Sequence, residues 1–495
     1  MDFQDDSFFG DGALGGKRKC KDWHRLRESE GAALYVGGIE ANDINQGALG
    51  DCYFLAALAA LAEEPKRVED LFLPSEGKGC YGVRWYNFGE PIDVYVDSRF
   101  PYDHGKPMFS SSSQDEMWVL ILEKAFAKKF GSYHAIESGL PGDALAEITG
   151  SPVTVCNPGR CWNGDVWNHL TTFNGAKDKQ VDASNVSCAS ITGSPVFRLF
   201  TFGIFRYFYW LLVALWDLLY MCGIIQCPMD FMYALTTYVL SFVHFVLAAI
   251  DNLCCGIFST FHTQMNVWIV GLVPGHAYSV LEVKGGSCTQ LVKLRNPWGK
   301  TEWRGWYSDK SVCWWICGTL KEELGIVDDD DGSFWMHLND FCCYFDRVDT
   351  CHINPNTASI RVTGKISSLK TCVLFTVKGQ EDTLVSVQIN QPRNGEQPGR
   401  MLAWRLRVVK SSEINVGDDE EGLSPGYASS SYHYDCQKAT RDMNLKPGKY
   451  AIMIDSHPSD KKKVKNHVHA TIVLSSGTPE FLTFDIPGLK AANDV

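Results

Sequence analysis

The chain has 495 residues, of which 45% are hydrophobic and 21% are charged, an ordinary globular composition with room for several domains. The formal net charge of −12 argues against nucleic acid as a partner, because no basic stripe would neutralise phosphates. The acidic first residues lack the parts of a secretory signal, so we expect a cytoplasmic protein whose 18 cysteines are mostly reduced and buried. Their spacing completes no zinc site.

The stretch DINQGALGDCYFLAALAALAEE, residues 43–64, predicts an Ala/Leu-rich helix over residues 54–62 with Cys52 in its first turn. The free N–H groups and the positive end of the macrodipole at a helix N-terminus favour thiolate, so we expect a lowered pKa for Cys52. Gln46, just upstream, can offer its side-chain amide to an oxyanion. These residues predict a nucleophilic cysteine if a base lies elsewhere in the chain.

A candidate base lies in a later segment that reads as two strands and a Trp-rich loop. His276 opens the alternating run HAYSVLEV, and Asn296 ends the next strand, QLVKLRN. Adjacent antiparallel strands would place the two side chains together, and the Asn amide would fix the tautomer of the imidazole. Trp298 could shield that hydrogen bond from water. Cys, His and Asn follow one another in the order found in papain-like proteases.

The chain resembles the calpain family of intracellular cysteine proteases. The resemblance rests on QGALGDCYFLAALAALA, GHAYSV, RNPWGKTEWRGWYSD and DDDGSFWMHLNDF, and it runs from about residue 30 to about residue 475 with one large interruption. It implies that Cys52 is the nucleophile, His276 the general acid and base, Asn296 the orienting residue, and Gln46 the oxyanion donor beside the Cys52 backbone N–H. Calpains usually carry Trp where this chain has Tyr53.

The resemblance implies an α+β fold, a papain-like two-lobed protease core followed by an antiparallel β-sandwich. The expected parts are a tail at 1–30, a lobe bearing Cys52 at 31–150, a lobe bearing His276 and Asn296 at 151–345, an apolar helical insert at 195–262 within that second lobe, a β-sandwich at 353–478 and a tail at 479–495. The alternating runs after residue 353, with turn residues between them, independently predict the sandwich.

Calpains need Ca²⁺ to bring the two lobes together, so the resemblance also implies metal ligands. The first site would use the carbonyls of Val36 and Gly38 with the side chains of Asp43 and Glu123. The second site would use Glu302, Asp309, the carbonyl of Asp329, and Asp331. Calpains commonly have Glu where this chain has Ser333, so we expect weaker calcium binding at the second site. The 328–331 run of Asp does not fit the EF-hand pattern.

The β-sandwich region contains an acidic loop at 417–421 and a basic loop at 461–465. Calpain loops of this kind have been assigned to calcium, phospholipid or interdomain contacts, and ordinary solvated hairpin ends are an equal alternative here. Only a short segment follows the sandwich. We therefore expect a form without the EF-hand domain of many calpains, and no small-subunit partner is implied.

The insert at 195–262 is strongly apolar. Residues 207–225 carry one charge and residues 231–250 carry none, each near the length of about 20 residues that crosses a bilayer. A membrane hairpin that tethers the protease, a helical pair lying on the protein or bilayer surface, and a segment that is not native to the active enzyme remain open alternatives.

Two functions of different classes compete. The first is a calcium-dependent cysteine endopeptidase that makes limited cuts in intracellular protein substrates and whose location is cytoplasmic, with or without membrane association. The second is a catalytically silent calpain-like scaffold associated with a membrane. The full set of catalytic residues favours the protease, whereas the insert and Ser333 keep the scaffold open.

Overall fold

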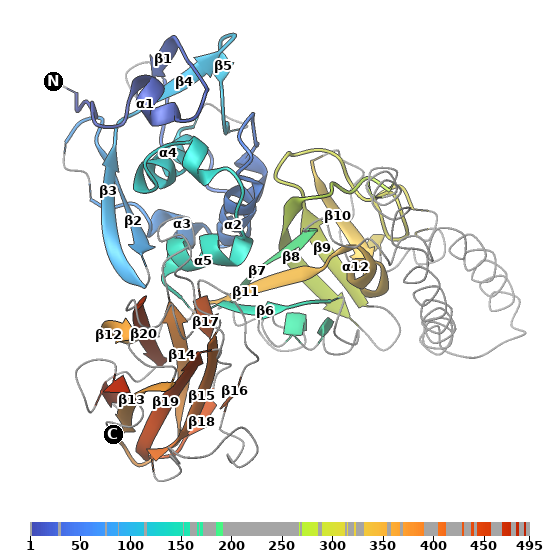
Figure 1. The fold of residues 1–495 in the computed structure, drawn as a ribbon. Helices are drawn as coiled ribbons and strands as arrows, with labels where there is room; N and C mark the ends of the chain where they lie inside the picture. Colours follow the sequence, from blue (N-terminus) through green and yellow to red (C-terminus); the bar gives the residue numbers. More distant parts are fainter. Residues whose placement is uncertain are drawn as a thin grey trace, which may run out of the picture.

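This computed structural model describes residues 2–191 and 267–491 with gaps inside both ranges, of which the longest are 172–184, 323–330, 391–403, 412–427 and 457–467. Figure 1 shows three parts: a first lobe (blue to cyan), a second lobe (green to yellow), and a C-terminal part (orange to red). The predicted insert at 195–262, Asp329, and the charged loops at 417–421 and 461–465 lie outside the described residues. Among the described helices, none is long and apolar enough to span a bilayer.

The first lobe is built around two buried helices. Its elements are α1 (Gly10–Leu14), β1 (Asp22–Arg25), η2 (Ala41–Asp43), α2 (Cys52–Ala62), α3 (Pro65–Glu69), β2 (Tyr81–Asn87), β3 (Glu90–Val96), β4 (Arg99–Asp103), β5 (Lys106–Pro107), α4 (Trp118–Lys129), η3 (His134–Ile136) and α5 (Pro141–Thr149). Every residue of α2 after Cys52 is buried. Because its side chains are mostly Ala and Leu, neighbouring elements pack closely around the whole helix.

The segment expected to be an N-terminal tail instead folds onto the first lobe, so this boundary was wrong. Strand β1 pairs antiparallel with β4. The reason lies in a buried carboxylate: Asp97 is fully buried and accepts the backbone N–H of Asp5 at 3.0 Å and the Lys124 ammonium at 2.6 Å. Asp5 in turn accepts a bond from Lys128 at 2.8 Å. Buried charges require such partners, and the N-terminal segment supplies some of them.

The second lobe is a six-stranded sheet with every neighbouring pair antiparallel, in the order β10-β9-β8-β7-β11-β6. The strands are β6 (Val153–Cys156), β7 (Asn185–Ile191), β8 (His276–Gly285), β9 (Gln290–Arg295), β10 (Ser333–His337) and β11 (Arg347–His352), with helix α12 (Leu338–Tyr344) between the last two. Helix α2 lies against this sheet, and Ser279 Oγ on β8 donates to the Ala56 carbonyl at 2.7 Å. Thus α2 belongs to the first lobe and also packs against the sheet of the second lobe.

The C-terminal part consists of two antiparallel sheets that share one apolar core. Its strands are β12 (Ala358–Ile366), β13 (Lys370–Val377), β14 (Thr383–Asn390), β15 (Trp404–Lys410), β16 (Ala428–Ser429), β17 (Gln437–Ala439), β18 (Met443–Leu445), β19 (Gly448–Ser456), β20 (Val468–Ser476), β21 (Leu482–Phe484) and β22 (Lys490–Ala491). Both β21 and β22 pair with β13. The segment 479–495 is therefore not simply a tail, because Leu482 and its neighbours complete the sheet beside β13 and Leu482 is buried in the shared core.

Candidate active site

The loop before α2 is held from three sides, which fixes where the helix and Cys52 begin. The Gln46 N–H donates to the Pro297 carbonyl of the second lobe at 3.0 Å, and the Ala48 N–H donates to Met108 O at 3.2 Å. Gly47 passes so close to Phe109 that a Cβ there would lie 1.8 Å from the Phe109 carbonyl oxygen. Only glycine fits at that approach. The spacing of the QGALGD motif is therefore a packing requirement as well as a chemical one.

His276 and Asn296 lie side by side, as the strand reading predicts. His276 opens β8, and Asn296 follows the last residue of the adjacent antiparallel strand β9. His276 Nε2 and Asn296 Oδ1 are 2.8 Å apart, and both residues are buried. The hydrogen bond is therefore shielded from competing water.

The surroundings of the Asn296 amide fix the direction of that hydrogen bond. Asn296 Nδ2 donates to the carbonyls of Lys300 at 2.8 Å and Thr301 at 3.0 Å, while Oδ1 accepts the Trp298 N–H at 3.0 Å. The amide oxygen is thus the group that meets the imidazole, and His276 Nε2 carries the hydrogen. The other ring nitrogen, Nδ1, keeps its lone pair and is left as the base.

Aromatic side chains enclose the imidazole. The Trp298 ring centroid lies 4.7 Å from that of His276, and the Tyr278 ring meets His276 edge-on at 5.1 Å. Tyr278 is itself fixed, because its hydroxyl accepts the Val273 N–H at 2.9 Å. These contacts restrict the orientation of the ring and place Trp298 where it covers one side of the His276–Asn296 pair.

Cys52 is brought to the same place from the first lobe. Its sulfur lies at the backbone N–H of Ala277, the residue after His276, and also meets the N–H groups of Tyr53 and of Cys52 itself. The structure therefore brings Cys52, His276 and Asn296 together at the junction of α2, β8 and β9.

Burial favours the neutral form of both Cys52 and His276 in this structure. Burial raises the pKa of the Cys52 thiol to about 11, despite the N–H groups that favour its thiolate. Burial also lowers the pKa of His276 to about 4, although the Asn296 hydrogen bond works in the opposite direction. The lowered cysteine pKa expected from the helix N-terminus was wrong, because loss of water around the sulfur outweighs the helix N–H groups.

Gln46 lies beside this group with its amide turned inward. Its Nε2 donates to Leu49 O at 2.6 Å and reaches Asp51 Oδ1 at a longer 3.4 Å. The amide oxygen Oε1 is buried and has no hydrogen-bond donor among the described residues. Of the two amide hydrogens, the one directed at Asp51 is the more weakly held, and it is the one that an oxyanion would compete for.

The structure separates the carboxylates that were expected to form the first calcium site. Asp43, in η2, faces Glu116, and Glu116 Oε2 accepts the Val36 N–H at 3.0 Å. Burial first, and then the nearby Asp43 charge, raise the pKa of Glu116. Glu123 instead accepts the Ser110 N–H at 3.0 Å and is hydrogen-bonded to Asp51. The assignment of Glu123 to this site was wrong, because its position inside α4 turns it to the buried core.

Glu116 is the residue that sequence reasoning missed. It lies two residues before α4 and forms a parallel bridge with Ala33, while the Met117 N–H donates to the Ala33 carbonyl at 2.9 Å. That pairing brings Glu116 alongside the Val36 and Gly38 loop. Ca²⁺ prefers oxygen donors such as carboxylates and backbone carbonyls. This region offers two facing carboxylates and the carbonyls of a glycine-containing loop. The residues present therefore fit a calcium ion, with Glu116 in the place expected of Glu123.

The second expected site is partly assembled. Glu302 Oε1 accepts the Gly332 N–H at 2.9 Å, and Asp331 Oδ1 accepts the Ser333 N–H at 2.7 Å. Asp309 lies further along the Glu302 loop, and Asp329 is not among the described residues. Within the described part of the chain, no group of three or more His, Cys, Asp or Glu side chains is placed to hold a metal. The donors that the structure shows here are two carboxylates, and Ser333 contributes no third.

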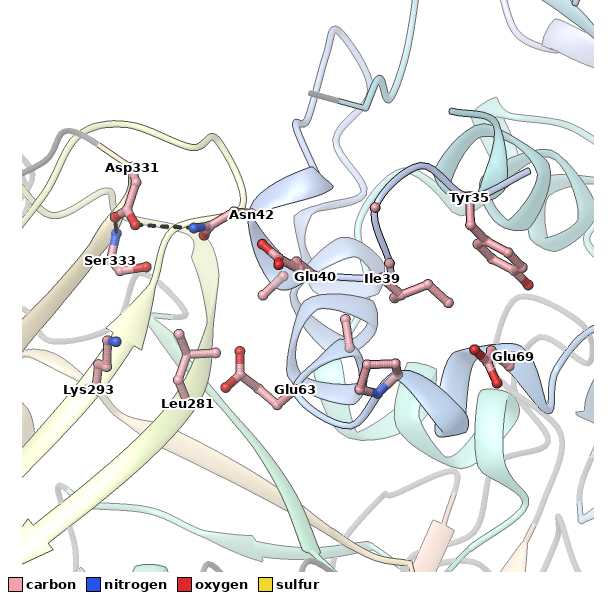
Figure 2. A pocket seen from close by; sticks show the side chains of 15 residues that line it. Tyr35, Ile39, Glu40, Asn42, Glu63, Glu69, Leu281, Lys293, Asp331 and Ser333 are labelled. Carbon is pink, nitrogen blue, oxygen red and sulfur yellow. Dashed lines mark hydrogen bonds between the residues drawn. The ribbon is translucent and has the colours of Figure 1, made fainter. Parts of the chain in front are cut away.

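A cavity of about 510 Å³ lies between the two lobes, next to the loops that the resemblance assigns to calcium (Figure 2). In this view Asn42 of the first lobe reaches Asp331 of the second, with Nδ2 and Oδ2 3.3 Å apart. Arg295 completes the connection, because its guanidinium donates to Asn42 Oδ1 at 3.0 Å and to Ile44 O at 3.0 Å. The loops that the resemblance assigns to calcium are therefore joined directly by protein hydrogen bonds.

Comparison with known proteins identifies a matching family and several relatives. The model of a family described as "Calpain family cysteine protease" matches residues 3–193 and 221–352, so the match resumes inside the predicted insert. The calpain-type cysteine protease DEK1 of Zea mays is 30% identical over 337 residues, covering 67% of this chain and 12% of that protein. Calpain-5 of Mus musculus is 27% identical over 389 residues, covering 72% and 50%, and Calpain-A of Drosophila melanogaster is 28% identical over 362 residues, covering 68% and 34%. The chain spans half or less of the length of these three relatives.

Proposed function

The chain belongs to the calpain family of cysteine proteases, and on that premise we propose that it is a calcium-dependent cysteine endopeptidase that makes limited cuts in intracellular proteins. The observation that carries the proposal is the 2.8 Å hydrogen bond between His276 Nε2 and Asn296 Oδ1, with the Cys52 sulfur at the Ala277 N–H. This bond occupies His276 Nε2 and leaves Nδ1 as the ring nitrogen with a free lone pair.

The neutral thiol and imidazole define the first step. As Cys52 Sγ attacks the scissile carbonyl, His276 Nδ1 accepts the thiol proton, so the pair becomes charged only as the new S–C bond forms. Asn296 holds the resulting imidazolium by its Oδ1 and keeps the ring oriented. Trp298 and Tyr278 limit access of water to the ring on the sides they cover.

The tetrahedral intermediate needs donors for its oxyanion. The Cys52 backbone N–H at the start of α2 and the weaker-bound amide hydrogen of Gln46 supply them. His276 then returns its proton to the leaving amine, which leaves a thioester on Cys52. A water molecule activated by the same imidazole hydrolyses the thioester and restores the free thiol.

Calcium would be held in the first lobe by Asp43 and Glu116, with the carbonyls of Val36 and Gly38, and in the second lobe by Glu302 and Asp331. When bound, Ca²⁺ supplies positive charge that binds these carboxylates and fixes the loops that carry them. The protein's own contribution is the connection of those loops through Asn42 and Arg295 to β9, the strand that directly precedes Asn296. The position of the first-lobe loop is thereby linked to the catalytic residues of the second lobe.

We also propose an intracellular, reducing location and a calpain-type β-sandwich role for the two C-terminal sheets. In support of the location, none of the nine cysteines that the structure describes is in a disulfide. The insert at 195–262 is proposed as a membrane tether, on its apolar sequence alone.

The test is cleavage of casein in reducing buffer with detergent, across a calcium titration and against a chelator control, with Cys52→Ala as the matched inactive variant. Calcium-dependent cutting that is absent from Cys52→Ala is the expected result. Folded wild type that neither cuts at any calcium concentration nor reacts at Cys52 with an electrophilic thiol probe would favour the scaffold. Deletion of residues 195–262 would then show whether the insert is what blocks activity.

A further inference from the structure

Two buried carboxyl groups lie directly behind the nucleophile, and the mechanism above uses neither. Asp51 is fully buried, Glu123 is 2% exposed, and their side chains are hydrogen-bonded to each other. Asp51 is the N-cap residue of α2, yet its side chain makes no capping hydrogen bond to the helix. An Asp at this position normally accepts a backbone N–H of the first helical turn. Here the side chain is turned toward Glu123 on α4 instead.

A hydrogen bond between two carboxyl groups requires a proton on one of them, because ionised carboxylates are acceptors only. Apart from a protonated Glu123, no donor group among the described residues reaches Asp51 Oδ2. Burial raises the pKa of Asp51 to about 7, and burial together with the neighbouring Asp51 charge raises the pKa of Glu123 well above its ordinary value. Of the two carboxyl groups, Glu123 binds the proton more tightly, and it still accepts the Ser110 N–H.

The pair touches the oxyanion donor. Asp51 Oδ1 is the longer of the two contacts of Gln46 Nε2, at 3.4 Å against 2.6 Å to Leu49 O. The other amide atom, Gln46 Oε1, has no donor among the residues that the structure describes, so nothing on that side holds the amide plane. The orientation of the Gln46 amide thus depends on Leu49 O and on where Asp51 is held.

We propose that Asp51 and Glu123 form a carboxyl–carboxylate pair that shares one proton and positions the Gln46 amide for the oxyanion. The inference rests on the proposed proteolytic function. It assigns Glu123 on α4 a role in the chemistry although it touches no reacting atom, and it makes Asp51 a positioning residue rather than a helix cap. Because one proton is shared, one negative charge is buried instead of two.

A double-mutant cycle tests the positioning role with a fluorogenic peptide at saturating calcium. Glu123→Leu removes the carboxyl group at similar volume, and we expect kcat to fall about 10- to 100-fold with KM within about twofold, as for a displaced oxyanion donor. Gln46→Ala should give a similar loss. If Glu123 acts through Gln46, the double variant should lose no more than about twofold beyond Gln46→Ala alone.

Two further variants distinguish positioning from general destabilisation. In Glu123→Gln the amide N–H donates to Asp51 and the amide oxygen accepts the Ser110 N–H, so activity should return to within about threefold of wild type. Ile121→Ala, at a fully buried apolar position on α4, should lower the melting temperature without lowering kcat. Losses from Glu123→Leu and Gln46→Ala that multiply, or an equal loss of kcat in Ile121→Ala, would overturn the proposal.

Difference infrared spectroscopy tests the shared proton without turnover. Wild type minus Glu123→Gln, at neutral pH and without substrate, should show the C=O stretching band of one buried, protonated carboxylic acid. A spectrum with only ionised carboxylate bands would overturn the shared proton. A wild type that shows the band but cleaves nothing would refute the protease and with it the positioning role, while the proton assignment would stand.

Discussion

Gly47 offers a sharp test of whether the loop before α2 sets the catalytic geometry. An alanine Cβ at this position would lie 1.8 Å from Phe109 O, whereas contacts of a Cβ under 3.0 Å are essentially never seen. The position of the Cβ is fixed by the Gly47 backbone, and Phe109 O is itself a backbone atom, so no side chain can move aside. The loop must therefore move by about 1.2 Å, which is the difference between these two distances. A misplacement of about 1 Å near a catalytic group lowers turnover by about 100-fold.

We therefore expect Gly47→Ala to lower kcat/KM about 100-fold and the free energy of unfolding by about 1–3 kcal/mol, the usual effect of overpacking. The matched control is Gly50→Ala in the same loop, where a Cβ meets nothing within 4 Å. Both variants are assayed on the fluorogenic peptide at saturating calcium, with urea unfolding in parallel. The reasoning fails if Gly47→Ala keeps activity within about twofold of wild type, or if Gly50→Ala loses as much.

Three other predictions address calcium, the tautomer of the imidazole and acid stability. Glu116→Gln should raise the calcium midpoint of tryptophan fluorescence about tenfold or more, because it removes one of two facing carboxylates, while Glu123→Gln should leave it unchanged. Asn296→Ala should lower kcat about 100-fold with little change in KM, because the Nε2–H of His276 loses its acceptor. The matched control is Asn296→Asp, which keeps an oxygen at that position. Burial lowers the pKa of His276 and His337 to about 4 from 6.5, so unfolding takes up protons between these values. Stability should be full above pH 6.5 and fall as the pH drops toward 4, by at most about 3 kcal/mol for each histidine.

Each of these has an outcome that contradicts it. Equal calcium midpoints for Glu116→Gln and wild type would remove Glu116 from the first site. Full kcat in Asn296→Ala would mean that the strand and Trp298 alone orient the imidazole. For the histidines, urea unfolding of His337→Phe should depend less steeply on pH than that of wild type, and identical slopes would exclude His337 as a source of the acid lability.

The position of the catalytic residues was predictable because it depends on local patterns. His276 and Asn296 are separated by a short antiparallel connection, so their strands had to be neighbours, and β8 and β9 are paired. Cys52 was identified at a helix start by the Ala/Leu run that follows it. Only the meeting of Cys52 with His276 needed the resemblance, because they are far apart in the sequence and lie on different lobes.

The ionisation of the site was not predictable from the sequence. The helix N-terminus at Cys52 is a local feature, but burial of its sulfur depends on β8 closing against α2. The choice between Glu116 and Glu123 failed for a similar reason. Glu116 lies two residues before α4 and Glu123 lies within it, and which of them faces Asp43 is set by the bridge between Ala33 and Glu116, a contact distant in sequence. The one local hint was that Glu123 lies within the apolar run WVLILEKAF, whose residues are all buried in α4.

The arrangement places Cys52 and His276, the proposed nucleophile and base, on separate lobes, so the proposed activity depends on the contacts that set the spacing of the lobes. Ser279 holds β8 against α2 through the Ala56 carbonyl, and Arg295 holds β9 against the Asn42 loop. Arg295 is 1% exposed and immediately precedes Asn296, so a shift of its loop contacts is transmitted to the orienting amide by one peptide unit. Because the loops proposed to bind calcium end at these same contacts, the proposal makes metal binding and imidazole orientation parts of one connection between the lobes.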